Sequence, residues 1–192
     1  MFEILGAYKK YSRKMNYELF ENFYKNEVIH LFTDVFTDSE GSSEGRVIGN
    51  LVSNLINRTN PDDLIGCIAI ENETIQGGLF FSRLTVTNDQ SAFILSPVAI
   101  ATKAQGSGVG QQLINYGLHH LKSINVHLVF TYGDPDYYAK TGFQPIKESV
   151  IPAPYPLSQP VGWLAQPLYS KTIEAIPGPT DCVAALSNPD YW

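Results

Sequence analysis

A glycine-rich loop carries the strongest chemical signal in the sequence. Between apolar stretches at 91–100 and 108–122 the chain reads Gln105-Gly106-Ser107-Gly108-Val109-Gly110. Glycines at every second position let the backbone adopt conformations that other residues avoid and let a ligand approach closely. Where such a loop opens a helix, its amides gather at the positive end of the helix dipole and bind anions. The loop therefore predicts a phosphate or pyrophosphate site, and a helix start that is merely rich in glycine is the alternative.

Two common phosphate-binding patterns do not fit this loop. The dinucleotide pattern G-x-G-x-x-G, counted from Gly106, requires a glycine where Gln111 stands. The nucleoside-triphosphate pattern G-x-x-x-x-G-K-[ST] fails at the same position, and no lysine follows it. The loop does match Q/R-x-x-G-x-G/A, with Gln105, Gly108 and Gly110 at the defined positions.

At this loop the sequence resembles the GNAT N-acetyltransferase superfamily, whose members hold the pyrophosphate of acetyl-CoA with that pattern. A second segment adds to the resemblance, because an apolar strand at 126–131 precedes the run Gly-Asp-Pro-Asp-Tyr-Tyr-Ala-Lys-Thr-Gly-Phe at 133–143. GNAT enzymes look like this after their fifth strand, with a short tyrosine-bearing helix and then Gly-Phe. The resemblance covers about residues 25–147, and the Pro-rich tail with Trp163 and Trp192 is similar to that of one bacterial GNAT subgroup.

The resemblance implies a binding site for acetyl-CoA as cosubstrate, with no metal. The segment 95–100 looks like the splayed fourth strand of the family, whose backbone pairs with the pantetheine arm in the manner of an added strand. Pro97 cannot donate to a strand ladder, so a gap or bulge is expected there. The residues predicted to bind the cosubstrate are Val98, Ala99, Ile100, Gln105, Gly106, Ser107, Gly108, Val109 and Gly110.

Tyr138 is the candidate catalytic residue. It stands four residues before Gly142, where the family places its general acid, and it would protonate the departing CoA thiolate. Packing of an aromatic side chain on a short helix is the alternative role. Tyr137 is expected to point elsewhere and to serve as the natural control, and Tyr132 is a weaker rival. Asp134 is expected to cap the short helix rather than to catalyse.

The acceptor is predicted to be a primary amine, of a small molecule or a peptide, that attacks the thioester directly in a ternary complex. No general base is visible, because the fourth strand has no Glu or Asp, although Ser96 could position a water molecule. A loop expected between the first two helices would carry acidic residues, whose alternative role is that of solvated helix-terminal carboxylates. The predicted acceptor-site residues are Phe36, Glu40, Glu44, Ser96 and Trp163. A non-catalytic acyl-CoA-binding or sensing module is the alternative function.

Composition narrows the class of protein. The 192 residues are 44% hydrophobic and 17% charged, which predicts one globular domain. A net charge of −6 argues against nucleic acid as a partner. The two cysteines, Cys67 and Cys182, have no metal-type or redox-type spacing, and this favours a reducing, cytoplasmic location. No apolar run approaches 18 residues, so no membrane span is expected, and a homodimer is left open.

The apolar periodicity predicts an α/β (α+β) fold with one mixed sheet and helices on both faces. The resemblance makes this sheet GNAT-like, mostly antiparallel and of about six to seven strands. The expected domain organisation is a flexible leader at 1–14 and a single N-acetyltransferase domain at 15–192, with core motifs at 91–147 and a Pro-rich C-terminal extension at 150–192. The expected elements are a strand at 16–22, a helix at 25–36, a turn at 37–45, a helix ending near 60, strands at 64–70 and 77–86 joined by a turn at 74–77, a strand at 91–100, a helix at 108–122, a strand at 126–131, a short helix around 138, and strands at 142–146 and 162–168.

Overall fold

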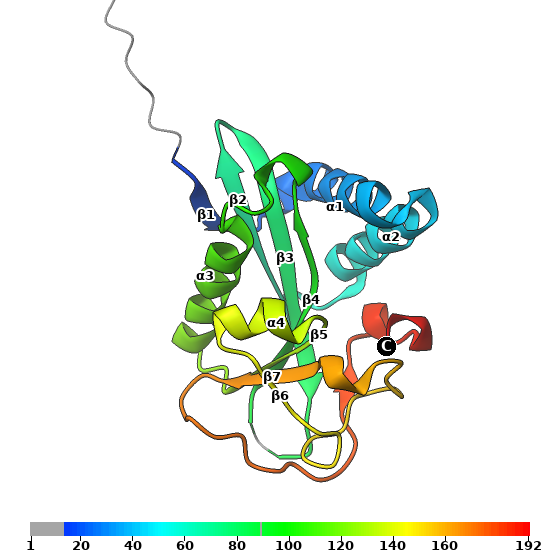
Figure 1. Ribbon diagram of the computed structural model, residues 1–192, viewed down its shortest axis with the longest axis vertical. Helices are drawn as coiled ribbons and strands as arrows, with labels where there is room; N and C mark the ends of the chain where they lie inside the picture. The colour runs from blue at the N-terminus through cyan, green and yellow to red at the C-terminus, as the bar shows by residue number, and fades with distance from the viewer. Residues whose placement is uncertain (1–13, 89) are drawn as a thin grey trace, which may run out of the picture.

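The computed structural model describes residues 14–88 and 90–192, and its centre is one twisted sheet (Figure 1). The strand order in the described chain is β1-β2-β3-β4-β5-β7-β6, with β8 beside β3. Only β4 and β5 pair in parallel; the other described pairs are antiparallel. The strands are β1 (Asn16–Leu19), β2 (Leu64–Glu71), β3 (Thr74–Thr85), β4 (Ala92–Ile100), β5 (Leu128–Tyr132), β6 (Gln144–Pro145), β7 (Trp163–Pro167) and β8 (Asp181–Cys182).

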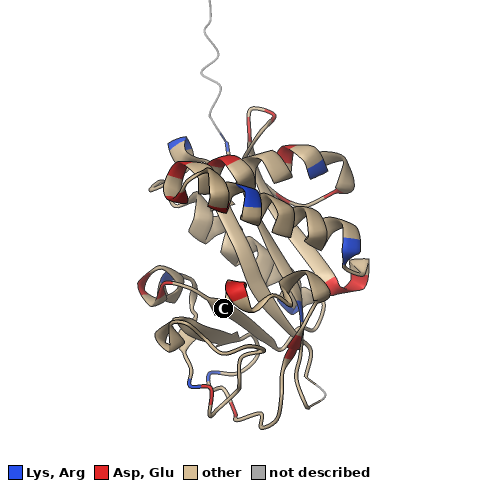
Figure 2. Cartoon of the chain, turned by 90° about the vertical axis from the view of Figure 1, so that its right-hand side faces the viewer, with Lys and Arg blue, Asp and Glu red and all other residues tan. Residues whose placement is uncertain are grey.

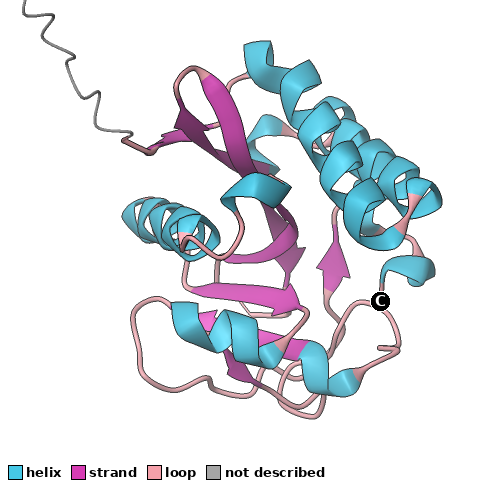
Figure 3. Cartoon of the chain, turned by 45° about the horizontal axis from the view of Figure 1, so that its top comes forward, coloured by secondary structure: helices cyan, strands magenta, loops and turns pink. Residues whose placement is uncertain are grey.

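Helices cover both faces of this sheet (Figure 3). Helices α1 (Lys25–Glu40) and α2 (Ser42–Arg58) pack with the C-terminal tail over one face. Helix α3 (Val109–Ser123) and the single turn α4 (Pro135–Tyr138) belong to the opposite face. The mixed, mostly antiparallel architecture predicted from the sequence is therefore confirmed. Short 3-10 helices lie at Asn22–Tyr24, Pro61–Asp63, Thr102–Ala104, Ala139–Thr141, Pro160–Gly162, Ala184–Leu186 and Pro189–Tyr191.

The turn predicted at 37–45 is wrong, because α1 runs to Glu40 and α2 begins at Ser42. Gly41 alone reverses the chain, with a φ of 95° that favours glycine. The small residues beyond it serve packing instead: a Cβ on Gly45 or Gly49 would collide with the Thr37 or Thr33 hydroxyl of α1. Figure 2 shows both signs of charge along these two helices. The polar residues from Asp38 to Ser43 are exposed.

One further boundary and one short strand differ from the predictions. The β2–β3 turn lies at Asn72 and Glu73, both at positive φ, and not at 74–77. Asparagine tolerates the left-handed conformation, so Asn72 marked this turn better than Gly77, which lies against the Ile100 side chain. Strand β8 was not predicted, because two residues carry no periodicity. The leader expected at 1–14 lies outside the described residues except for Lys14, and no described helix is long and apolar enough to cross a membrane.

The C-terminal tail returns to the sheet face that α1 and α2 cover. The Trp192 ring is 5% exposed and lies 6.2 Å from the fully buried Trp163 ring. Hydrogen bonds fix this end of the chain, since the Trp192 indole N–H donates to the Leu186 carbonyl (3.1 Å) and the Ser158 amide donates to the Trp192 carbonyl (2.7 Å). The tail therefore belongs to the core of the domain.

Candidate active site

A fork between β4 and β5 forms the centre of the candidate site. The parallel pairing of these strands runs from Ala92 opposite Leu128 to Leu95 opposite Thr131 and ends there. On the other side of β4, Leu79 pairs with Val98 but Phe81 pairs with Leu95, so Phe80 faces two β4 residues. This bulge confirms the irregularity expected at Pro97 and turns the second half of β4 away from β5. Backbone groups of β4 beyond Leu95 are therefore left without a partner on β5.

The glycine loop forms a cradle of free amides at the end of β4. None of the amides from Gly106 to Gln111 donates a hydrogen bond within the described chain. Gly106 and Gly108 have φ of 71° and 86°, and a Cβ on Gly106 would meet no atom within 4 Å. The first turn of α3 contains no acidic residue, so its positive end is not neutralised. These amides and this open space fit an anionic phosphate group.

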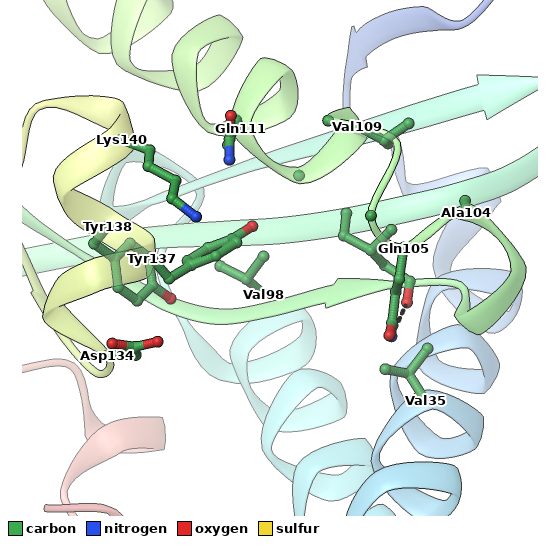
Figure 4. Close-up of a pocket in the computed structure, with 14 residues that line it drawn as sticks. Val35, Val98, Ala104, Gln105, Val109, Gln111, Asp134, Tyr137, Tyr138 and Lys140 are labelled. Atoms are coloured by element: carbon green, nitrogen blue, oxygen red, sulfur yellow. Dashed lines mark hydrogen bonds between the residues drawn. The ribbon is translucent and has the colours of Figure 1, made fainter.

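The loop is held in place by its own side chains. The side-chain amide of Gln105 donates to the Ile100 carbonyl (3.0 Å), as Figure 4 shows, and the Ser107 hydroxyl donates to the Ala104 carbonyl (2.5 Å). The glutamine of the loop pattern therefore has a structural explanation, because its side-chain bond ties the loop to the end of β4. Ser107 points back into the loop, and its own amide remains free.

Gly110 has a different role from the other two glycines. A Cβ at this position would collide with the Tyr137 hydroxyl and lie 3.3 Å from Ile100 Cγ1. The last glycine of the pattern therefore admits an aromatic side chain from α4 against the start of α3. Sequence reasoning assigned this glycine to the ligand, and only the tertiary contact shows its second partner.

A cavity of about 610 Å³ connects the cradle with α4 (Figure 4). The lining residues come from α1, the outer half of β4, the loop, the first turn of α3, and the segment 134–140 that contains α4. Among the residues predicted to bind the cosubstrate, Ala99 and Ser107 do not line the cavity, and the Ala99 side chain is buried on the other side of its strand. The lining residues are Val35, Val98, Ile100, Ala104, Gln105, Gly106, Gly108, Val109, Gly110, Gln111, Asp134, Tyr137, Tyr138 and Lys140.

Tyr138 lines the same cavity as Val98 and lies beside Thr131, where the pairing of β4 with β5 ends. Its ring packs edge-on against Phe143, with centroids 5.7 Å apart, and against the backbone of Gly133. Burial raises the pKa of Tyr138 to about 12; the nearby Thr131 hydroxyl opposes this shift, and the charges of Tyr137 and Asp134 add to it. The phenol therefore keeps its proton throughout the neutral pH range.

The two other tyrosines occupy different positions. The expectation that Tyr137 points away is wrong, because it lines the same cavity with its ring at 86° to that of Tyr138. Burial also raises the pKa of Tyr137. Tyr132 is outside this cavity: its hydroxyl pairs with Ser158 (2.9 Å) and accepts from the Gln159 amide (2.6 Å). Tyr138 and Tyr137 are thus the two phenols beside the fork.

The predicted acceptor-site residues are not brought together. Glu40 ends α1 and is exposed, and Glu44 lies in the first turn of α2, so the loop expected to carry them is not formed. Trp163 is fully buried, and its indole donates to the Ile151 carbonyl (2.9 Å). Phe36 packs against the core, and Ser96 faces a small cavity of about 40 Å³ near Trp192.

Sequence reasoning missed Asp134, Lys140, Gln111 and Val35 as lining residues. Asp134 does cap α4 as expected, since its Oδ1 accepts from the Asp136 amide (2.9 Å). Within the described chain, no group of three or more His, Cys, Asp or Glu side chains is arranged to hold a metal ion. Lys140 places a positive charge at the cavity that the glycine loop also lines.

Comparisons with known proteins agree with this arrangement. No family model matches the sequence. An uncharacterized N-acetyltransferase of Escherichia coli K12, YjhQ, is 35% identical over 98 residues, which are 48% of this chain and 54% of that protein. The chain spans about half the length of the curated relatives it matches.

The solved structures extend the similarity to nearly the whole chain. The GNAT family N-acetyltransferase YhbS of Escherichia coli, solved with CoA, superposes with a TM-score of 0.74 at 18% identity, over 92% of this chain and 94% of that one. A Brucella melitensis GNAT acetyltransferase solved with acetyl-CoA superposes with a TM-score of 0.68 at 19% identity, over 90% of this chain and 98% of that one. The chain has the GNAT fold. The fork, the free amides and the α4 tyrosine thus lie in a GNAT framework, and the resemblance found in the sequence is confirmed.

Proposed function

We propose that this GNAT-fold chain transfers an acetyl group from acetyl-CoA to a primary amine, with both substrates bound at once. Acetyl-CoA would supply the activated thioester. The amides from Gly106 to Gln111 would bind its pyrophosphate, and Lys140 would add a positive charge. The names of the curated relatives and the CoA-containing neighbours support this assignment.

The outer half of β4 would align the pantetheine arm. Val98 and Ile100 line the cavity, and β4 has no partner on β5 beyond Leu95. An extended ligand can pair with such a free strand edge through backbone hydrogen bonds. An amide near Val98 is the candidate donor to the developing oxyanion, which a fixed dipole stabilises in the transition state.

Tyr138 would act as the general acid. As the amine forms its bond to the carbonyl carbon and the carbon–sulfur bond breaks, the phenol would give its proton to the sulfur. Its raised pKa keeps it protonated until then. Both cysteines are buried, so a covalent acetyl-cysteine route is not favoured.

The observation that carries the proposal is the continuous cavity from the free amides of the loop to the phenol at the fork. The test is calorimetric binding of acetyl-CoA, followed by an amine screen in which release of the CoA thiol is measured. Gly108→Asp should abolish binding, because it adds charge and a side chain at a φ of 86° in the open cradle. Asn72→Asp is the control, because it adds a negative charge at an exposed position that already holds a side chain at positive φ and lies outside the cavity.

Three outcomes separate the possible functions. Micromolar binding that Gly108→Asp abolishes and Asn72→Asp preserves, together with thiol release, supports the transferase. Binding without transfer to any amine supports a non-catalytic acyl-CoA-binding or sensing module. Wild-type protein that binds no acetyl-CoA refutes both functions and leaves the glycine loop as a helix start.

A further inference from the structure

Asp134 lies between two cavities of the domain. The first is the 610 Å³ cavity with the glycine cradle and Tyr138. The second, of about 360 Å³, lies beside the end of β5, where the chain from Ser158 to Gly162 passes α4. Asp134 is the residue that both linings contain. The second cavity is lined by Tyr132, Gly133, Asp134, Pro135, Ser158, Gln159, Val161 and Gly162.

Asp134 offers the only carboxylate among the described residues that line either cavity. One oxygen caps α4 through the Asp136 amide, and the structure gives the other oxygen no hydrogen bond or ion pair. Figure 4 shows the carboxylate below the two tyrosines of α4. Its charge reaches Tyr138, where it contributes to the raised pKa. A cation at Asp134 would therefore lie close to the proposed general acid.

Apart from the exposed Gln159 side chain, the remainder of the second cavity is apolar or already hydrogen-bonded. Val161 is 65% exposed, and Pro135 and two glycines add hydrocarbon surface. The Tyr132 hydroxyl is occupied by Ser158 and by the Gln159 amide. A ligand in this cavity would meet a mostly hydrophobic wall, the Gln159 side chain and one negative charge, at Asp134. A polycation would find no second carboxylate among the described lining residues.

We propose, on the basis of the proposed function, that Asp134 binds the ammonium group of the acceptor while the apolar part of the acceptor occupies the second cavity. The acceptor class is then a primary amine on a single hydrocarbon or aromatic group. The ammonium gives one proton to solvent, and the free amine forms the C–N bond as the C–S bond breaks. Tyr138 protonates the sulfur and regains a proton from the nitrogen, so one proton is released in each turnover.

The first test measures binding, independently of turnover. The probe is 2-phenylethylamine, which is cationic at pH 7, titrated calorimetrically into protein saturated with CoA. Asp134→Asn should weaken its binding about tenfold, since a charge-assisted hydrogen bond is lost. Asparagine is a good N-cap, so α4 should stay formed. Asp136→Asn is the matched control: it removes a neighbouring exposed charge outside both cavities and should leave the affinity unchanged.

The second test uses turnover with acetyl-CoA. The ratio of kcat/KM for 2-phenylethylamine to that for phenylhydrazine, which is uncharged at pH 7, should fall about tenfold in Asp134→Asn and remain constant in Asp136→Asn. Wild-type protein should also prefer 2-phenylethylamine to 1,4-diaminobutane. Equal effects of the two variants, or a preference for the diamine, overturn the inference while the transferase stands. Failure to acetylate any amine overturns the transferase instead, and calorimetry still reports whether Asp134 binds the ammonium.

Discussion

The contact between Gly110 and Tyr137 can be tested by a double-mutant cycle. Gly110→Ala places a Cβ against the Tyr137 hydroxyl, whereas the next ring atom, Cζ, is 3.6 Å away. Overpacking of this kind costs about 1–3 kcal/mol. The helix propensity of alanine returns up to about 1 kcal/mol of this. Tyr137→Phe removes the one atom that collides, so the double variant should tolerate the new methyl group.

The expected coupling in the free energy of unfolding is therefore about 1–3 kcal/mol, measured by urea denaturation of wild type, both single variants and the double variant. In thermal scans the single variant Gly110→Ala should unfold a few degrees below the double variant, at roughly 2–4 °C per kcal/mol for a chain of this size. Acetyl-CoA affinity should follow the same pattern, because the contact lies in the lining of the cavity. If the changes in the free energy of unfolding of the two single variants sum to that of the double variant within about 0.5 kcal/mol, Gly110 is not required to accommodate Tyr137.

Of four further predictions, two concern the proposed general acid, one the packing of α1 against α2, and one the cysteine thiols. Tyr138→Phe keeps the ring against Phe143 and should lower kcat about 10²- to 10⁴-fold with little change in acetyl-CoA affinity; a parallel loss of affinity would assign the ring a structural role. Because the pKa of Tyr138 is about 12, deprotonation of this phenol should not lower the wild-type kcat as the pH rises to 10. A fall in kcat above neutral pH that disappears in Tyr138→Phe would contradict this. Gly49→Ala should lower the free energy of unfolding, measured by chemical denaturation, by about 1–3 kcal/mol, because its Cβ meets the Thr33 hydroxyl. In a Thr33→Ala background most of this loss should disappear. Cys67 and Cys182 are buried, and burial raises the pKa of both thiols, to about 12 for Cys67. Ellman's reagent should therefore react slowly with both thiols in the native protein at pH 7.5 and rapidly with both after denaturation. Rapid labelling of the native protein would refute their burial.

The sequence predicted the elements with long periodic patterns and missed those set by contacts across the sheet. The apolar stripes of α1, α2 and α3 and the alternation along the strands are local signals, so these elements were found. The prediction of a turn at 37–45 was wrong because the polar residues of this segment are typical of turns, whereas its glycine Gly45, with Gly49, allows α2 to approach α1 closely. Strand β8 escaped because its two residues are defined by their partners, Leu84 and Thr85.

The candidate site divides in the same way. The glycine loop and Tyr138 could be found from the sequence, since each lies in a short motif with a defined spacing. The acceptor side could not, because Glu40, Ser96 and Trp163 come from separate elements and the structure does not bring them to one cavity. Asp134 was recognised as a helix cap and not as a cavity residue, because capping is a local property and cavity lining is not.

By itself the sequence determined the glycine loop at 105–110, the strand before it, the helix after it and the tyrosine of α4. Backbone conformation at glycines, dipoles at helix starts and apolar periodicity all act over a few neighbouring residues. The tertiary structure alone decided that β4 and β5 separate after Leu95 and Thr131, that Tyr137 lies against Gly110, and that Asp134 lies between two cavities. These features depend on which distant segments pack together, which is settled by the burial of the whole core rather than by local preference.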